Sequence, residues 1–291
     1  MDDYLRSTGA IPADKVIDLE VLSPAARTQR GRFHSRVWKG LVPAHSFWQL
    51  QEAPTSGPVL VSFPGFALVQ AARDLGDSGC LGAAFELLGA YREQGRLSRD
   101  EPVCEQASLA AYLDLIPLSQ QGTRRARRCV RLAVPGAWSP MESALTACLC
   151  MPRDLGGMGL PRPQLNAPID LPPDIAHAVG YQRLHVDLLW SAERVVAEYQ
   201  GSAHFEANGR PQDDRRRINA LQSLGYRVLA LAWEDLRDLL RLDAPADKLA
   251  SWLGCPGPLE ARPDRGTQAQ LMAGVRDWRQ HWREIVPPKR P

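Results

Sequence analysis

The sequence predicts an α/β (α+β) protein in which a domain of mixed helices and strands follows a mostly helical N-terminal region. Three observations support this fold class. A helix start signal lies at Ser139, two apolar segments with strand-like alternation are joined by residues 191–194, and an amphipathic segment ends at Gly225 just before an apolar, β-branched run. This order of helix, strands, helix and strand is typical of proteins in which helices cover a sheet.

Length and composition describe an ordinary globular protein. The chain has 291 residues, of which 44% are hydrophobic and 23% are charged. At about 100–200 residues per domain, the length predicts two domains. No apolar run approaches the roughly 18–20 residues that span a bilayer, and the polar N-terminus lacks the apolar segment of a secretory signal. We therefore expect a cytoplasmic protein with no membrane partner.

The cysteines do not form a metal or redox motif. They stand at positions 80, 104, 129, 148, 150 and 255, and no two of them form a C-x-x-C pair. This spacing suits neither a zinc knuckle nor a thiol–disulfide centre. We expect six free thiols in a reducing compartment.

The N-terminal region contains one clear strand and several helices. Residues 59–63 (VLVSF) form an apolar, β-branched run that ends at a proline, which predicts a strand. The segments FALVQAARDL and CLGAAFELLGAYREQ predict two helices separated by a turn at 76–79, and a third helix is expected over 106–115. The proline and glycine at 135–136 then interrupt the pattern, so we expect a domain boundary there.

A basic helix is predicted over residues 122–133 (GTRRARRCVRLA). Arg124, Arg128 and Arg131 share one face, and small apolar residues occupy another. One interpretation is a helix that contacts nucleic-acid phosphates through Arg124, Arg125 and Arg128. The other interpretation is a helix whose basic face is simply solvated.

The second region opens with a helix whose start is well defined. Ser139 at the N-cap, Pro140 in the first turn and Glu142 three residues after the serine form a capping box, so a helix should run to about Cys150. A glycine- and proline-rich loop follows. We expect a weak strand over 164–169 and then a proline-containing loop.

Two strands form the centre of this region. Residues 183–190 (RLHVDLLW) alternate between apolar and polar positions, and 194–200 (RVVAEYQ) resemble a second strand. The connection at 191–194 is short enough for a β-hairpin. An amphipathic helix over 212–224, a strand over 226–230 and a helix over 233–240 complete the region.

We divide the chain into three parts on this basis. Residues 1–135 form a mostly helical recognition or partner domain, and residues 139–255 form the mixed domain. Residues 256–291 form a C-terminal helix near 268–285 followed by a loose tail.

Asp187 and Glu198 are the first candidates for chemistry. Each interrupts an apolar strand, and in a hairpin the two would lie on adjacent strands near its middle. A carboxylate inside an apolar strand is costly unless it is paired or binds a metal, and one or two carboxylates are the usual protein ligands of Mg²⁺. The alternative is that both side chains point outward from a half-exposed sheet. The segment 139–240 is net acidic and both flanks are net basic, as suits a metal-dependent nuclease.

The ordered motifs in this region resemble a known family. RLHVDLLW, RVVAEYQG, His204, the DRRR of residues 214–217 and the GYRVL of residues 225–229 are similar to the very-short-patch-repair-like branch of the PD-(D/E)XK endonuclease superfamily. The resemblance implies a restriction-endonuclease-like fold for 139–255, a central mixed four-stranded sheet flanked by helices. More weakly, FALVQAARDL, FELLGAYRE and SPMES resemble the N-terminal region that such proteins share with abortive-infection-type antitoxins.

The resemblance also implies a metal centre. Asp187 and Glu198 would bind Mg²⁺ (or Mn²⁺), and the main-chain carbonyl of Tyr199 would be a further ligand. Glu142 would approach from the first helix, although the capping box explains this residue equally well.

The catalytic lysine of the superfamily is absent. Gln200 stands where many relatives carry lysine or aspartate, and no lysine occurs between Lys39 and Lys248. Glutamine cannot accept a proton at physiological pH. Either metal-bound water suffices, or His204 near the scissile phosphate assists, or the site is inactive. His204 can also be read as a plain loop residue, and His185 is a second histidine candidate beside Asp187.

The start of the predicted helix at 212–224 is basic. Arg215, Arg216 and Arg217 are candidates for phosphate contacts, and Asp214 with Arg217 could instead hold the helix against the sheet. A solvated helix start is the alternative for all three arginines.

Three functional hypotheses follow. The first is a metal-dependent DNA endonuclease or nickase that hydrolyses phosphodiester bonds. The second is a nuclease-derived, non-cleaving DNA-binding regulator, similar to an antitoxin. The third is a structural partner in a protein complex. We expect DNA as the partner in the first two cases, and a protein partner encoded by a neighbouring gene is a further candidate.

Overall fold

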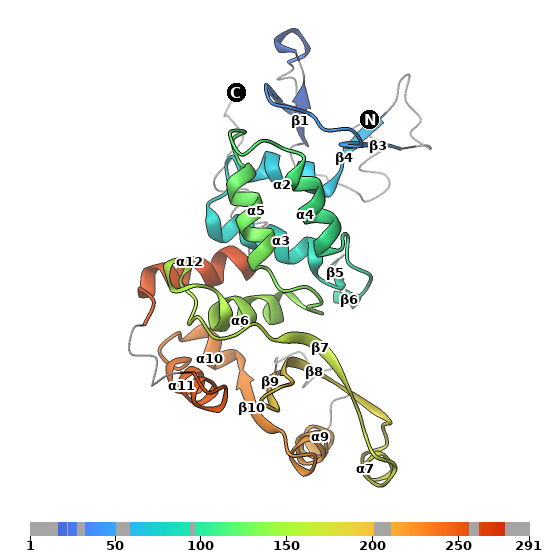
Figure 1. Ribbon diagram of the computed structural model, residues 1–291, viewed down its shortest axis with the longest axis vertical. Coiled ribbons are helices and arrows are strands. Elements are labelled where there is room, and N and C mark those ends of the chain that lie inside the picture. The colour runs from blue at the N-terminus through green and yellow to red at the C-terminus, as the bar shows by residue number, and fades with distance from the viewer. Residues whose placement is uncertain are drawn as a thin grey trace.

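A computed structural model describes most of the chain (Figure 1). The described residues are 17–21, 23–27, 33–50, 59–93, 97–200, 211–255 and 262–276. Among them, no helix combines the length and apolar character needed to cross a membrane. All six cysteines are free thiols, as the sequence predicts.

Four helices pack together in the first half of the chain. They are α2 (Pro64–Ala71), α3 (Asp77–Leu88), α4 (Gln106–Asp114) and α5 (Thr123–Leu132). The predicted helices are present, but their bounds differ. The first ends at Ala71, and the second begins at Asp77, inside the turn expected at 76–79, and does not run through CLGAAFELLGAYREQ. It ends at Leu88, and Gly89, a residue of low helix propensity, follows with an extended backbone. Residues Tyr91–Glu93 then form strand β5, which pairs with β6 (Leu97–Arg99).

Two small sheets lie at the N-terminal end. Strand β1 (Ile17–Val21) pairs in parallel with β2 (Phe33–Val37), and β3 (Phe47–Leu50) pairs antiparallel with β4 (Val59–Ser62). A short 3-10 turn, η1 (Pro24–Ala26), follows β1. Of these strands, β4 corresponds to the strand predicted at 59–63.

Helix α6 (Pro140–Cys150) begins where the capping box predicts. The Ser139 hydroxyl accepts a hydrogen bond from the Glu142 amide at 3.2 Å, and nearly every residue of the helix is buried. Helix α12 (Arg265–Arg276) packs against both α3 and α6 (Figure 1). It begins earlier than the predicted start at 268, because Asp264 accepts hydrogen bonds from the Thr267 amide and hydroxyl.

One apolar core joins the N-terminal helices, α6, α12 and the sheet. This main core includes side chains of α2, α3, α6 and α12 together with one face of the sheet described below. Representative members are Phe66, Phe85, Leu145, Leu188 and Leu271. The described part of the C-terminal segment is therefore built into the same core as the N-terminal helices.

A four-stranded mixed sheet forms the other end of the molecule (Figure 1). Its strands are β7 (Gln164–Asp170), β8 (Arg183–Trp190), β9 (Val195–Gln200) and β10 (Arg227–Ala232), in the order β10-β9-β8-β7. Strands β9 and β10 are parallel, and the other neighbours are antiparallel. This confirms the predicted mixed sheet and the predicted β8–β9 hairpin.

Helices connect and cover these strands. Helix α9 (Pro211–Ser223) links β9 to β10, and Gly225 follows it with a φ of 82°. A second apolar cluster lies on the α9 face of the sheet and includes Val186, Val196 and Leu221. The loop expected after β7 instead contains α7 (Pro173–Val179), because proline suits a first helical turn and Gly180 ends the helix at a φ of 81°.

The segment after β10 also differs from the prediction. Helix α10 (Trp233–Arg237) stops three residues before the expected end at 240, because Asp238 is extended. Helix α11 (Asp243–Trp252), which the sequence analysis did not predict, follows and contributes Leu249 and Ala250 to the main core.

Candidate functional site

The sheet is interrupted at Asp187. On β7 the opposite residue is Asn166, and the pairing of β7 with β8 passes over these two residues while keeping its register on both sides. Asn166 has a φ of 50°, which residues other than glycine adopt uncommonly and Asn most readily. The flanking pairs are Leu165 with Leu188 and Ala167 with Val186.

The alternation of faces also shifts at this gap. Side chains two residues apart on a strand normally share a face, yet Val186 lies in the second cluster and Leu188 in the main core. On β7, Leu165 packs against the main core and Ala167 lies in the second cluster. The two residues at the gap therefore leave the pairing together, and the alternation of faces changes on both strands at that point.

The Asp187 side chain reaches β9. The pairing of β8 with β9 ends at Leu188 and Ala197, and beyond it the Tyr199 amide donates a hydrogen bond to Asp187 Oδ2 at 2.7 Å. A carboxylate thus takes the place of a main-chain acceptor. Asp187 and Glu198 lie in the middle of β8 and β9, as predicted, but just past the last paired residues of the hairpin.

Two other carboxylates act on Asp187. The pKa of Asp187 is raised well above its ordinary value, first by burial and then by the negative charges of Glu198 and Glu142. The Tyr199 amide and the Arg217 guanidinium act in the opposite direction but do not cancel the effect. Asp187 therefore favours a proton, and by the same electrostatics it favours a bound cation.

Glu142 is buried, with 8% of its surface exposed, and both of its carboxylate oxygens accept hydrogen bonds from neighbouring residues. Oε1 accepts from the Ser139 hydroxyl at 2.9 Å. Oε2 accepts from the Trp138 amide at 2.8 Å and from Asn166 Nδ2 at 2.6 Å. The capping role is therefore real, and it also fixes the charge of Glu142 close to Asp187.

Arg217 ties α9 to the sheet. Its Nη2 donates to the main-chain carbonyl of His185 at 2.9 Å and lies 3.8 Å from Glu198 Oε1. These contacts correspond to the interpretation in which the arginine holds the helix against the sheet. Arg215 and Arg216 are exposed on the same helix, and the side chain of Asp214 lies outside the described part of the structure.

The remaining predicted polar residues are placed differently. Gln200 is exposed at the end of β9, opposite Ala232 of β10. His204 lies outside the described residues. His185 Nδ1 is 3.0 Å from the Asn166 carbonyl, and its ring packs against Trp138 at a centroid distance of 5.0 Å.

The site is suited to a hydrated cation with few protein ligands. Within the described residues, no three Asp, Glu, His or Cys side chains converge at metal-binding distance. Asp187 and Glu198 remain as two carboxylates on neighbouring strands, a donor set that Mg²⁺ accepts together with water and substrate oxygens. Glu142, whose oxygens are already hydrogen-bonded, adds charge without being placed as a ligand.

The arginines of α5 are largely engaged within the protein. Arg125 donates to Asp77 at 2.7 Å and to the Ala72 carbonyl at 2.6 Å. Arg128 is paired with Asp154, and Arg124 Nε donates to a main-chain carbonyl at 3.1 Å. Their contacts join α5 to α3 and to the loops beside it. A surface pocket of about 360 Å³ is lined by this face of α5.

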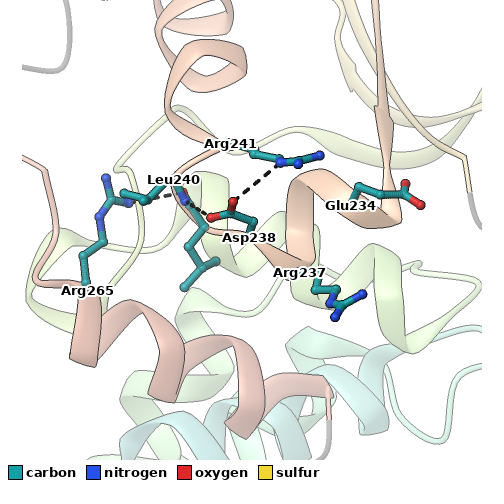
Figure 2. Close-up of a pocket in the computed structure, with 7 residues that line it drawn as sticks. Glu234, Arg237, Asp238, Leu240, Arg241 and Arg265 are labelled. Atoms are coloured by element: carbon teal, nitrogen blue, oxygen red, sulfur yellow. Dashed lines mark hydrogen bonds and ion pairs between the residues drawn. The ribbon is translucent and has the colours of Figure 1, made fainter.

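A second surface pocket lies beside α10 (Figure 2). It has a volume of about 620 Å³ and is lined by charged residues from α10, the following loop and the start of α12. Arg241 is 3.5 Å from Asp238, and Arg265 is paired with Asp243. Most of this charge is compensated locally, and no residue of the acidic site lines the pocket.

Asn166 was not among the predicted site residues. Its only signal was an asparagine inside an expected strand, a position that this residue type disfavours. It nevertheless contacts Glu142 and His185 and lies opposite Asp187.

No family model matches the chain, and comparisons with curated proteins and with solved structures likewise find no similar protein.

Proposed function

We propose that the protein is a metal-dependent nuclease that hydrolyses phosphodiester bonds of DNA, with Asp187 and Glu198 as the metal ligands. The observation that carries this proposal is the opening of the sheet at Asp187, which turns its carboxylate toward β9 beside Glu198 while Glu142 is fixed nearby. Folding brings together like charges that repel one another. Such an arrangement is costly in a purely structural site and is offset when a cation binds.

Each residue has a distinct chemical task in this proposal. Mg²⁺ at the site would supply stabilisation of charge on the phosphoryl oxygens and would lower the pKa of a water molecule. Asp187 is held in orientation by the Tyr199 amide. Arg217 holds α9 beside Glu198 and keeps that carboxylate near the centre. Glu142 adds negative charge that favours a cation over an empty site.

The attacking water must also lose a proton, and the site needs an acceptor for it. Gln200 lies at the end of the strand that carries Glu198 and can hydrogen-bond a water molecule without taking its proton. In this proposal Gln200 positions the attacking water, and solvent accepts the proton.

The order of elements supports a restriction-endonuclease-like assignment within the very-short-patch-repair-like branch. Helix α6 precedes β7, β8 and β9, and α9 leads to the parallel strand β10. The three acidic residues lie on α6, β8 and β9, as the sequence resemblance implies.

Plasmid cleavage tests the proposal. Purified protein should convert supercoiled plasmid to nicked or linear DNA in Mg²⁺ or Mn²⁺ and not in the presence of a chelator. Asp187→Asn keeps an acceptor for the Tyr199 amide but removes the charge, so it should abolish cleavage with unchanged circular dichroism. Cleavage that persists in this variant contradicts the proposed site.

A second function is a DNA-binding regulator that does not cleave. The specific observation in its favour is Gln200 in place of a catalytic lysine. This function predicts salt-dependent DNA binding with no metal-dependent cleavage, and binding that is the same in wild type and Asp187→Asn.

A further inference from the structure

The backbone of Asn166 is exceptional among the described residues. Three non-glycine residues there have positive φ: His45, Asn166 and Arg194. His45 and Arg194 lie in turns, whereas Asn166 lies inside β7. A positive φ in a strand persists only where surrounding contacts hold it, and such residues concentrate at functional sites.

Asn166 contacts three other residues, two through its side chain and one through its main chain. Its Nδ2 donates to the Gly136 carbonyl at 3.0 Å and to Glu142 Oε2 at 2.6 Å. Both amide hydrogens therefore have acceptors. Its main-chain carbonyl contacts His185 Nδ1 at 3.0 Å. Asn166 on β7 thus links the start of α6 to His185 on β8.

The oxygen of the Asn166 side-chain amide, Oδ1, lacks a hydrogen-bond donor among the described residues. Asn166 is only 7% exposed. A buried acceptor without a donor is costly, and its presence calls for an explanation such as an ordered water. Ionised carboxylates nearby cannot satisfy it because they are acceptors only. A donor brought by a ligand can, and the water molecules of a hydrated divalent cation are donors of this kind.

We propose that Asn166 is a positioning residue of the acidic site, and this inference rests on the proposed function. Its Nδ2 holds Glu142 in place, its left-handed backbone opens the β7–β8 pairing at Asp187, and its Oδ1 accepts a hydrogen bond from a water molecule of the bound cation. Asn166 touches neither the substrate nor the reacting atoms. It acts through Glu142, Asp187 and water.

Two substitutions separate these tasks. Asn166→Gly retains a residue that adopts positive φ freely and removes the whole amide. Asn166→Asp keeps the side-chain shape and a residue type that tolerates positive φ, but it replaces the donor that faces Glu142 with an acceptor. Gln164→Asp is the matched control, because it adds a carboxylate at an exposed position two residues away on β7.

The experiment is a calorimetric Mn²⁺ titration of the full chain, with plasmid cleavage at several Mn²⁺ concentrations as a second readout. Loss of contacts just outside the ligand set typically lowers metal affinity or activity roughly 10–100-fold. We expect a loss of that size for Asn166→Gly and Asn166→Asp, with the cleavage midpoint shifted to higher Mn²⁺, and no change for Gln164→Asp. Circular dichroism restricts the comparison to folded protein.

The possible failures are distinguishable. Wild-type protein that neither binds Mn²⁺ nor cleaves DNA overturns the proposed function and this inference with it. Wild-type protein that binds and cleaves, while both Asn166 variants have unchanged Mn²⁺ affinity, overturns the role of Asn166 alone. If one variant does not fold, the affinity of the other decides.

Discussion

The Tyr199 amide donates a 2.7 Å hydrogen bond to Asp187 Oδ2, at the point where the pairing of β8 with β9 stops. This contact orients the Asp187 carboxylate, whose pKa is raised by burial, by Glu198 and by Glu142. The β7–β8 pairing is interrupted at Asp187, which is also the centre of the proposed site.

Asp187→Asn should make the metal-free protein more stable. The substitution removes a buried charge that Glu198 and Glu142 repel, while the amide oxygen still accepts from Tyr199. We expect a higher melting temperature together with loss of Mn²⁺ binding, the trade-off between stability and activity that is common at functional sites. A lower melting temperature with a native circular dichroism spectrum would show that the charge of Asp187 is stabilised by the folded protein itself.

The stability of the metal-free protein should depend on pH through Asp187. Its pKa is raised in the folded protein, so the folded state holds this proton more tightly than the unfolded chain, whose aspartates titrate near about 3.9. The stabilising contribution is full below that value and is lost as pH rises through the raised pKa. Glu198, Glu142 and Arg217 are the charges that face this group.

Urea denaturation at a series of pH values measures this effect. The free energy of unfolding of Asp187→Asn minus that of wild type should grow as pH rises from acidic to neutral. A difference that stays constant over this range would contradict the raised pKa.

Arg217→Gln should destabilise the protein. The substitution removes the hydrogen bond to the His185 carbonyl and the positive charge beside Glu198. Losing a hydrogen bond to a charged group costs about 1.5–3 kcal/mol. Chemical denaturation measures the loss, and Arg215→Gln, on the exposed side of the same helix, should have little effect. Equal effects of the two substitutions would argue against the pinning role.

Gln200→Lys tests the missing proton acceptor. A lysine at this position can orient or activate the attacking water, and general acid–base catalysis contributes roughly 10²–10⁴-fold. We expect faster plasmid cleavage than wild type in Mg²⁺, and Gln200→Met should be slower than wild type because it cannot hydrogen-bond water. A Gln200→Lys variant with unchanged or slower cleavage would indicate that another group already supplies this role.

Gly274→Ala tests whether the C-terminal helix belongs to the common core. A Cβ at Gly274 would lie 2.5 Å from the Ser78 Cβ, where α12 packs against α3. Overpacking of this kind costs about 1–3 kcal/mol, so the denaturation midpoint should fall. Gly76→Ala is the matched control, because a Cβ there meets nothing within 4 Å. A harmless Gly274→Ala would contradict close packing of these helices.

Local signals in the sequence predicted much of the sheet and its helices. The N-cap at Ser139, the strand over 183–190 and the glycine after α9 each depend on neighbouring residues, and each is confirmed. The second half of the capping box differs, because Glu142 accepts from the Trp138 amide and the Ser139 hydroxyl, and the alternation along β8 shifts at Asp187. Helix α7 was missed because its two prolines resemble loop signals, although proline is well suited to a first helical turn. Helix α11 was missed because its apolar positions are few and its burial depends on distant segments.

The site could be predicted only in part. Asp187 and Glu198 stand out as carboxylates in apolar strands, but their exact place in the hairpin depends on where main-chain pairing stops. Asn166 became visible only when its φ and its contacts with Glu142 were known. Those contacts connect residues far apart in the chain, so no local pattern encodes them.

Calorimetric titration of Mn²⁺ into wild-type protein and Asp187→Asn tests the metal site most directly. We predict saturable binding to the wild type and none to Asp187→Asn, with both proteins folded by circular dichroism. Absence of binding to the wild type, or equal binding to both proteins, would contradict a metal centre at Asp187 and Glu198.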